Sequence, residues 1–523
     1  MKRLPIGIDT FENLRTGNHV YIDKTKIAYE LIETGKYYFL SRPRRFGKSL
    51  FVDTLHCIFE GKKELFEGLF IYDNYDWEQK NPVIKISFGA GTLHSRKELD
   101  RRIIDILKEN QKRLDLECED TSYVAGCFNE VIRLAYEKTG QPVVVLVDEY
   151  DKPILDNITD IDAANEIRDG LRNFYSVIKD NDRYLRFAFL TGVSKFSQVS
   201  LFSGLNNLKD ITLDERYGTI CGYTQRDVET SFVEHLDGVD LEKLKEWYNG
   251  YSWLGESVYN PFDILLFFDK GKAYKNYWFE TATPNFLINL LKERNYFLPS
   301  LETLEMSEND LGSFEVESLK VETLLFQTGY LTIREEKQIF EDYVYSLTYP
   351  NKEVRKSLNE YLFRFFTKVE SKLNMPFYRT VIADDFDAQR VFLTSLFASI
   401  PYNNFVNNRM YEKEGYYASV MYAYFASLGL TLIAEDVTNK GRIDLTLKIP
   451  ATEESSEKIY IFEFKVIEDM NNSKKPLDQI KERGYADKYS GLKSSSGINV
   501  SIFLIGIEFS KKERNICGFE WEK

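Results

Sequence analysis

The chain has 523 residues, which exceeds the roughly 250–300 residues at which a single hydrophobic core stops growing, so two or three domains are expected. Its apolar fraction of 43% and charged fraction of 29% exclude a disordered, collagen-like or low-complexity protein. With 68 Lys and Arg against 82 Asp and Glu, the formal charge is −14, which argues against a surface that attracts nucleic acid as a whole but leaves room for a local basic groove.

The five cysteines are scattered, odd in number and never spaced as CxxC, so neither a disulfide framework nor a zinc knuckle is predicted, and a cytoplasmic location is expected. The N-terminal segment meets Asp9 before an apolar run forms, so no secretory signal is predicted. The longest uncharged stretch, residues 415–434, contains Tyr, Ser, Gly and Thr, and is better interpreted as a buried helix, turn and strand than as a membrane span.

The first part of the chain alternates apolar strands with amphipathic helices. Strands are predicted at residues 36–40, 82–88, 142–147 and 184–190, and helices at 98–114 and 163–178. Continuously apolar strands separated by helices are typical of a parallel sheet covered on both faces. The fold class is therefore α/β, with a first domain at residues 1–223.

The middle of the chain, residues 224–374, is predicted to be mostly helical, with connectors rich in Tyr and Phe. Within it, residues 324–333 followed by 343–349 suggest a helix end, strand, turn and strand, which is compatible with a winged-helix-like element. Residues 375–523 contain a strand at 441–449, a polar turn, a strand at 459–466, a helix at 478–489 and a final strand at 501–509, so a C-terminal α/β domain is predicted there.

A phosphate-binding loop is predicted between the first strand and the next helix. A loop of this kind needs backbone N–H groups at a helix N-terminus, a lysine for the outer phosphates and a hydroxyl for Mg²⁺. Gly47, Lys48 and Ser49 supply the second half of GxxxxGK[ST], whereas Arg42 stands at the first glycine position. Arg44 and Arg45, like Arg42, are compatible with phosphate contacts, with a contact across the interface of a homo-oligomer, or with solvation.

The acidic partner expected downstream follows the third strand. Asp148 is predicted to hold Mg²⁺ through water, and Glu149 to orient or activate the attacking water in nucleotide hydrolysis. Thr191, at the end of the next strand, is expected between the acidic pair and the γ-phosphate, with Ser194 as the alternative. The predicted ligand is ATP with Mg²⁺, bound by Arg45, Gly47, Lys48, Ser49, Asp148 and Thr191, with Ser49 and Asp148 on the metal.

A second constellation lies near the C-terminus. Glu463 and Lys465 are two residues apart on one strand and so face the same side, and Asp444 reaches them if its strand pairs with theirs. Two carboxylates that share a ligand bind a hard cation, Mg²⁺ or Mn²⁺, and a neighbouring lysine can stabilise the charge on an attacked phosphodiester. Glu414, with Glu412 behind it, is the candidate third metal ligand, and Gln479 is a candidate contact of the site. The alternative is a structural ion pair on an exposed strand.

These motifs resemble a known family. The segments YIDKT, YYFLSRPRRFGKSL, VVVLVDEYDKP and LTGVSKFS resemble the bacterial AAA-ATPase-like family, which is commonly fused to a PD-(D/E)XK nuclease-like domain, and GRIDL, FEFK and QIKERGYADKY are similar to that second domain. The resemblance runs from about residue 4 to the C-terminus. It implies P-loop roles for Lys48 and Ser49, an arginine at position 42 as normal, and a nuclease motif at Asp444, Glu463 and Lys465.

The resulting hypothesis is an ATP-controlled, Mg²⁺-dependent nuclease, with DNA favoured over RNA but the choice between them left open, in which Glu149, Asp444, Glu463 and Lys465 are catalytic. Two alternatives stay open at this point. One is a nucleotide-dependent switch whose nuclease-like domain binds nucleic acid or protein without cutting it. The other is a remodelling ATPase that uses the C-terminal domain for docking. Whether ATP is hydrolysed or only bound is also open.

Overall fold

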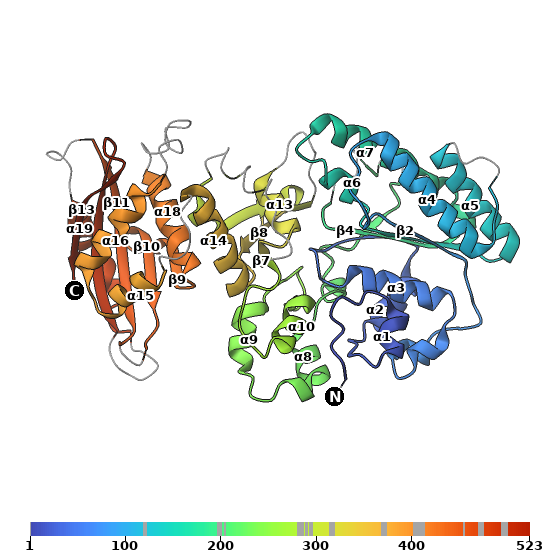
Figure 1. Cartoon of the computed structure of the whole chain (residues 1–523), viewed down its shortest axis with the longest axis horizontal. Coiled ribbons are helices and arrows are strands. Elements are labelled where there is room, and N and C mark those ends of the chain that lie inside the picture. Colours follow the sequence, from blue (N-terminus) through green and yellow to red (C-terminus); the bar gives the residue numbers. More distant parts are fainter. Residues whose placement is uncertain are drawn as a thin grey trace. The chain divides into compact units, whose positions relative to one another are not determined.

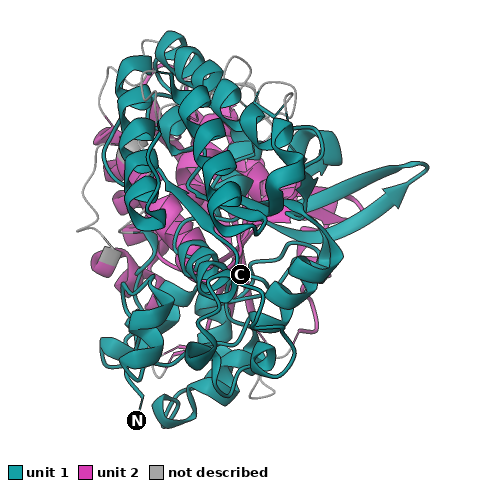
Figure 2. Cartoon of the chain, turned by 90° about the vertical axis from the view of Figure 1, so that its right-hand side faces the viewer, with its two compact units in different colours: residues 1–282, 305–346 teal, residues 283–304, 347–523 magenta. Residues whose placement is uncertain are grey.

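The computed structural model of the chain (Figure 1) describes residues 2–118, 123–195, 201–202, 205–279, 287, 291, 296–312, 320–367, 374–400, 414–452, 455–468, 475–492 and 500–523. The chain packs into two compact units: unit 1 contains residues 1–282 and 305–346, and unit 2 contains residues 283–304 and 347–523 (Figure 2). The division into three domains at residues 223 and 374 stays a prediction.

Unit 1 is built on a five-stranded parallel sheet of order β2-β3-β4-β1-β5. Figure 1 shows helices on both of its faces, α1–α3 on one and α4–α7 on the other, which explains why its strands are apolar almost throughout. The α/β prediction is confirmed. The strands are β1 (Tyr37–Ser41), β2 (Val83–Ser87), β3 (Val143–Asp148), β4 (Leu185–Gly192) and β5 (Lys209–Asp210). The helices are α1 (Phe11–Thr16), α2 (Thr25–Thr34), α3 (Lys48–Phe59), α4 (Arg96–Leu114), α5 (Val124–Thr139), α6 (Lys152–Leu155) and α7 (Ile161–Asp180).

The middle of the chain is helical, as predicted, and begins with helices whose aromatic-rich core also includes Val20 and Ile22 of the N-terminal segment. Phe232, Tyr248 and Phe267 are among the residues buried there. A three-stranded sheet of order β6-β8-β7 follows, so the predicted strand, turn and strand are present after a helix end. The elements are α8 (Gln225–Ser231), α9 (Leu241–Tyr248), α10 (Pro261–Asp269), β6 (Leu304–Ser307), α12 (Glu308–Gly312), α13 (Val321–Gln327), β7 (Thr332–Ile339) and β8 (Asp342–Thr348).

Unit 2 has a five-stranded sheet of order β13-β12-β11-β10-β9, in which β11 and β12 are parallel and the other neighbours antiparallel. The uncharged stretch forms α18, whose residues from Tyr416 to Ser427 are all buried, and then β9, as predicted. The strands are β9 (Thr431–Thr438), β10 (Gly441–Ile449), β11 (Lys458–Ile467), β12 (Ser501–Ser510) and β13 (Asn515–Glu522). The helices are α14 (Lys352–Thr367), α15 (Asn374–Ile382), α16 (Phe386–Ala398), α18 (Glu414–Ser427) and α19 (Pro476–Arg483).

The predicted helix at residues 478–489 is shorter than expected. Helix α19 ends at Arg483 because Gly484 takes a left-handed backbone conformation with φ 58°, and residues Tyr485–Lys488 form a separate 3₁₀ turn. Over the described part of the chain, none of the helices combines the length and the apolar character needed to cross a membrane.

Candidate functional sites

A cavity in unit 1 lies at the carboxyl end of β1 and has a volume of about 450 Å³. Its wall contains the predicted phosphate loop, the N-terminal segment around Asp9 and the start of α10. Cations outnumber acids in this wall, which favours an anionic ligand. The charged lining residues are Lys24, Arg44, Arg45, Lys48 and Lys152 on the basic side and Asp9, Glu149 and Asp151 on the acidic side.

The phosphate loop has the backbone that its sequence predicts. Gly47 has φ 91° and stands directly before α3, so the loop turns into the helix through a conformation that only glycine adopts without strain. Lys48 is buried at the first position of α3, and its Nζ donates to the carbonyl oxygens of Arg42 and Pro43, both at 2.9 Å. Burial lowers the pKa of this ammonium group. Ser49 follows on the first turn of the helix, and both side chains line the cavity.

Arg42 does not face the cavity. Its guanidinium group is fully buried and donates to the carbonyl oxygens of Ser41 (2.8 Å), Thr212 (3.0 Å) and Tyr217 (3.1 Å), and it lies 4.2 Å from the centroid of the Trp253 ring. The structure therefore supports neither a phosphate contact, nor a contact across an oligomer interface, nor solvation for Arg42. Its buried side chain instead ties the start of the loop to the segment that contains Thr212 and Tyr217.

The acidic pair and Thr191 lie at the carboxyl ends of β3 and β4. Burial raises the pKa of Glu149, and the neighbouring Asp148 raises it further. The buried Oδ1 of Asp148 and Oγ1 of Thr191 have no hydrogen-bond partner among the described residues. A buried oxygen without a hydrogen-bond partner destabilises the folded protein unless a bound ligand supplies that partner. Asp148 and Thr191 do not themselves line the cavity that contains Ser49, so their roles toward a hydrated cation and a phosphate stay predictions that their unpaired oxygens favour.

Ser194, the alternative to Thr191, is already engaged. Asp151 accepts hydrogen bonds from the Ser194 hydroxyl (2.5 Å), the Ser194 N–H (2.6 Å) and the Val193 N–H (3.1 Å). Sequence analysis did not single out Asp151, although it follows the acidic pair by two residues. Its carboxylate fixes Val193 and Ser194, which directly follow the end of β4 where Thr191 lies.

The second site lies in unit 2, where β10 and β11 pair antiparallel with Leu445 opposite Phe462. This register places Asp444 beside Glu463, as the sequence predicts if the two strands pair. Asp444 Oδ2 accepts the backbone N–H of Phe464 at 2.7 Å, and Gln479 Nε2 donates to Glu463 Oε1. The other oxygen of Glu463, Oε2, is buried without a hydrogen-bond partner in the described part of the chain.

The electrostatics of this site are dominated by buried negative charge. Burial raises the pKa of Asp444 to about 7, with further increases from Glu414 and Glu435, while the Phe464 N–H opposes them. Burial and the charge of Asp444 likewise raise the pKa of Glu463 to about 8. The pair therefore retains a proton near neutral pH unless a cation replaces it.

Glu414 and Lys465 stand around this pair. Glu414 begins α18 with an exposed side chain, and its charge acts on both Asp444 and Glu463. Lys465 is half-buried on β11; burial raises the pKa of Glu414, and the charge of Lys465 only partly opposes that rise. Glu412 lies outside the described residues. Glu435 was missed from the sequence because its place on β9 becomes relevant only once β9 pairs with β10.

Asp444 and Glu463 fit a divalent cation. The cation would bind the unpaired oxygen of Glu463, and its positive charge would stabilise both carboxyl groups in their deprotonated form. Within the ranges that the structure describes, no group of three or more His, Cys, Asp or Glu side chains is arranged to hold a metal ion. The role of Glu414 as a third ligand therefore stays a prediction, as do the catalytic roles of Glu149 and Lys465.

Comparisons with known proteins match both parts of the chain. Residues 5–202 match a family described as "Predicted AAA-ATPase", and residues 412–519 match the PD-(D/E)XK nuclease superfamily. A protein of Azotobacter chroococcum mcd 1, described as "Uncharacterized protein in vnfD 5'region", is 48% identical over 522 residues, which cover 99% of this chain and 98% of the relative.

Proposed function

Because the chain belongs to the family of predicted AAA-ATPases that carry a C-terminal PD-(D/E)XK nuclease domain, we propose that it binds ATP with Mg²⁺ in unit 1 and cleaves phosphodiester bonds in unit 2. DNA is the proposed substrate. The five cysteines are free thiols, and the cytoplasm is the proposed compartment.

One observation carries the proposal for unit 2. Half-buried Asp444 and buried Glu463 lie on adjacent strands with pKa values raised to about 7 and 8, and an oxygen of Glu463 has no partner among the described residues. A structural ion pair would pair these charges and lower the pKa of the acids. The arrangement instead suits residues that release a proton to hold a cation.

The residues of this site have three proposed roles: binding the metal, orienting the metal-binding carboxylates and stabilising charge on the substrate. Asp444 and Glu463 would hold Mg²⁺ or Mn²⁺, which when bound supplies charge stabilisation and an activated water. The backbone N–H of Phe464 and the side-chain amide of Gln479 keep the two carboxylates oriented. Lys465 would stabilise the negative charge that develops on the phosphodiester.

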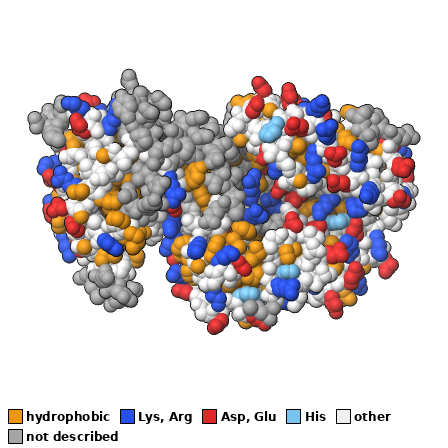
Figure 3. All heavy atoms as spheres, viewed as in Figure 1, with side chains coloured by type: hydrophobic (Ala, Val, Ile, Leu, Met, Phe, Trp, Pro, Cys, Tyr) orange, Lys and Arg blue, Asp and Glu red, His pale blue; other side chains and the backbone are white. Residues whose placement is uncertain are grey.

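In unit 1, Lys48 would leave the carbonyl oxygens of Arg42 and Pro43 to bind the outer phosphates. Glu149 would orient the attacking water if ATP is hydrolysed, and the helical middle of the chain would transmit the nucleotide state to the nuclease site. On the face seen in Figure 3, basic and acidic side chains are interspersed over the α/β part of unit 1, so contact with nucleic acid is proposed to be local and metal-assisted.

The test is cleavage of double- and single-stranded DNA by the purified full chain with Mg²⁺ or Mn²⁺. Asp444→Ala and Lys465→Ala should abolish cleavage, and Lys48→Ala should alter it by removing nucleotide control. Glu468→Gln is the matched control, because Glu468 lies just past the end of β11 with an exposed side chain paired to Lys511 and should leave cleavage unchanged. Inactivity on all DNA and RNA forms with the metal bound would refute the nuclease proposal.

A second candidate function is a nucleotide-dependent switch that binds nucleic acid or protein without cleaving it. It is favoured by the lack of a three-ligand metal group among the described residues. Calorimetric titration with Mn²⁺ separates the two candidates. A nuclease should show a site that Asp444→Asn removes, whereas a switch should bind ATP with no metal site in unit 2.

A further inference from the structure

The phosphate loop is held by two hydrogen bonds to its backbone and one ring contact, all from later residues of unit 1. The indole N–H of Trp278 donates to the carbonyl oxygen of Arg44 at 3.2 Å, and Gly222 N–H donates to that of Phe46 at 3.1 Å. The ring centroid of Phe46 lies 4.7 Å from that of Tyr251 in an edge-to-face contact. The loop on either side of Arg45 is therefore fixed.

Arg45 itself is exposed and has a positive φ of 71°. Its guanidinium carbon lies 5.1 Å from the centroid of the Phe262 ring, and it makes no hydrogen bond or ion pair within the described part of the chain. Phe262 is half-buried at the N-terminus of α10, where its N–H donates to the buried Asn260 Oδ1 at 2.9 Å. The backbone that carries the half-buried ring is thus held at the start of α10, while the arginine side chain is exposed.

Arg45 and Phe262 both line the cavity that contains Gly47 and Lys48. An exposed cation–π contact is weaker than the charge-assisted, bidentate hydrogen bonds that a guanidinium group makes to phosphate. A polyphosphate at Lys48 would therefore draw Arg45 away from the ring. The ring face that this exposes can stack on a nucleobase, since every base presents a π-face.

We propose that Arg45 and Phe262 form an exchangeable contact, in which the nucleotide's phosphates take the arginine and its base takes the vacated ring face. The inference rests on the proposed binding of ATP in this cavity and adds a base-binding residue to it. Phe262 then has two opposite effects: it competes with phosphate for Arg45, and it attracts the base.

The test compares two probes by calorimetry on the full chain, MgATP and magnesium tripolyphosphate, which has phosphates but no base. Arg45→Ala should weaken both by about tenfold. Phe262→Ala and Phe262→Leu should weaken MgATP by about tenfold or more, yet leave tripolyphosphate unweakened or up to about threefold tighter. Any gain in tripolyphosphate affinity from Phe262→Ala should be absent when the same substitution is made in the Arg45→Ala variant.

Phe70→Leu is the control, since Phe70 is an exposed phenylalanine of unit 1 that does not line the cavity, and it should change neither affinity. Thermal unfolding of each variant checks that it is folded. The proposed exchange is refuted if Phe262→Leu lowers the affinities for MgATP and tripolyphosphate equally, or lowers neither. If the folded wild-type chain binds neither probe, the proposed nucleotide site fails as well, and the inference falls with it.

Discussion

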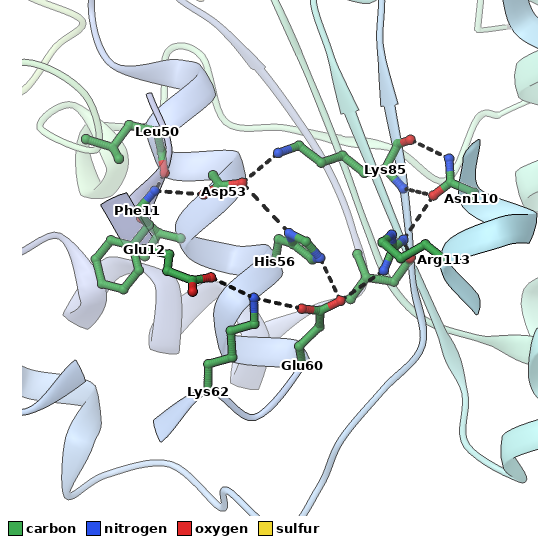
Figure 4. Close-up of polar contacts among 12 residues, drawn as sticks. Phe11, Glu12, Leu50, Asp53, His56, Glu60, Lys62, Lys85, Asn110 and Arg113 are labelled. Atoms are coloured by element: carbon green, nitrogen blue, oxygen red, sulfur yellow. Dashed lines mark hydrogen bonds and ion pairs between the residues drawn. The ribbon is translucent and has the colours of Figure 1, made fainter. Parts of the chain in front are cut away.

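Replacing Asp53 by asparagine tests how the helix that follows the phosphate loop is anchored. Asp53 is 6% exposed on α3, accepts the backbone N–H of Phe11 at 2.7 Å and contacts Lys85 Nζ at 2.6 Å, and His56 Nδ1 lies 3.8 Å away (Figure 4). Burial alone would raise the pKa of this carboxyl, but these three partners outweigh it and lower the pKa from 3.8 to about 2.

The shift sets the expected magnitude. A carboxyl whose pKa falls from 3.8 in the unfolded chain to about 2 in the folded one stabilises the fold by about 2 kcal/mol at neutral pH. Because folding lowers this pKa, the stabilisation is nearly complete above about pH 4 and is lost as the pH falls toward about 2. Near pH 3 it should be about half its neutral value.

The assay is urea unfolding of the full chain at pH 7 and pH 3, followed by tryptophan fluorescence. Asp53→Asn should lower the free energy of unfolding by about 2 kcal/mol at pH 7 and by about half as much at pH 3. Glu12→Gln is the control in the same region, because the side chain of Glu12 is 53% exposed and pairs with Lys62 at 3.1 Å. Such a pair contributes less than about 1 kcal/mol. An equal deficit at both pH values would show that shape, rather than charge, is what matters at position 53.

Three further variants or conditions probe the two sites. Gly192→Ala should destabilise unit 1, since a Cβ there would lie 2.3 Å from Asp151 Oδ1, and an unchanged melting temperature would contradict that contact. Arg42→Met should cost about 2 kcal/mol in denaturant unfolding, because it removes the Arg42 donor from the carbonyl oxygens of Ser41 and Thr212, whereas that of Tyr217 keeps the Ile220 N–H. At a low metal concentration, any metal-dependent cleavage should rise from about pH 6 to about pH 9 and then level off. The reason is that Asp444 and Glu463, with pKa values raised to about 7 and 8, must lose their protons to hold the cation, and a flat profile would refute this.

Sequence patterns predicted the elements of both sites well, because the relevant signals are local. The strand, loop and helix around Gly47 and Lys48 follow from an apolar run, a glycine and a helical periodicity within some twenty residues. The alternation that puts Glu463 and Lys465 on one side of β11 is likewise a property of any strand. Helix α19 was overestimated because the left-handed conformation of Gly484, which ends it, is not visible from helical periodicity alone.

The sequence by itself determined the fold class, the two motifs and the family, since these depend on residue order and spacing along short segments. Only the tertiary structure decided that the Arg42 side chain is buried away from the cavity, that Asp151 holds the residues just after β4, and that Arg45 rests on Phe262. It also decided the charge state of the carboxylate pair in unit 2. Burial and the approach of side chains from separate strands and helices set those pKa values, and neither exists until the chain has folded.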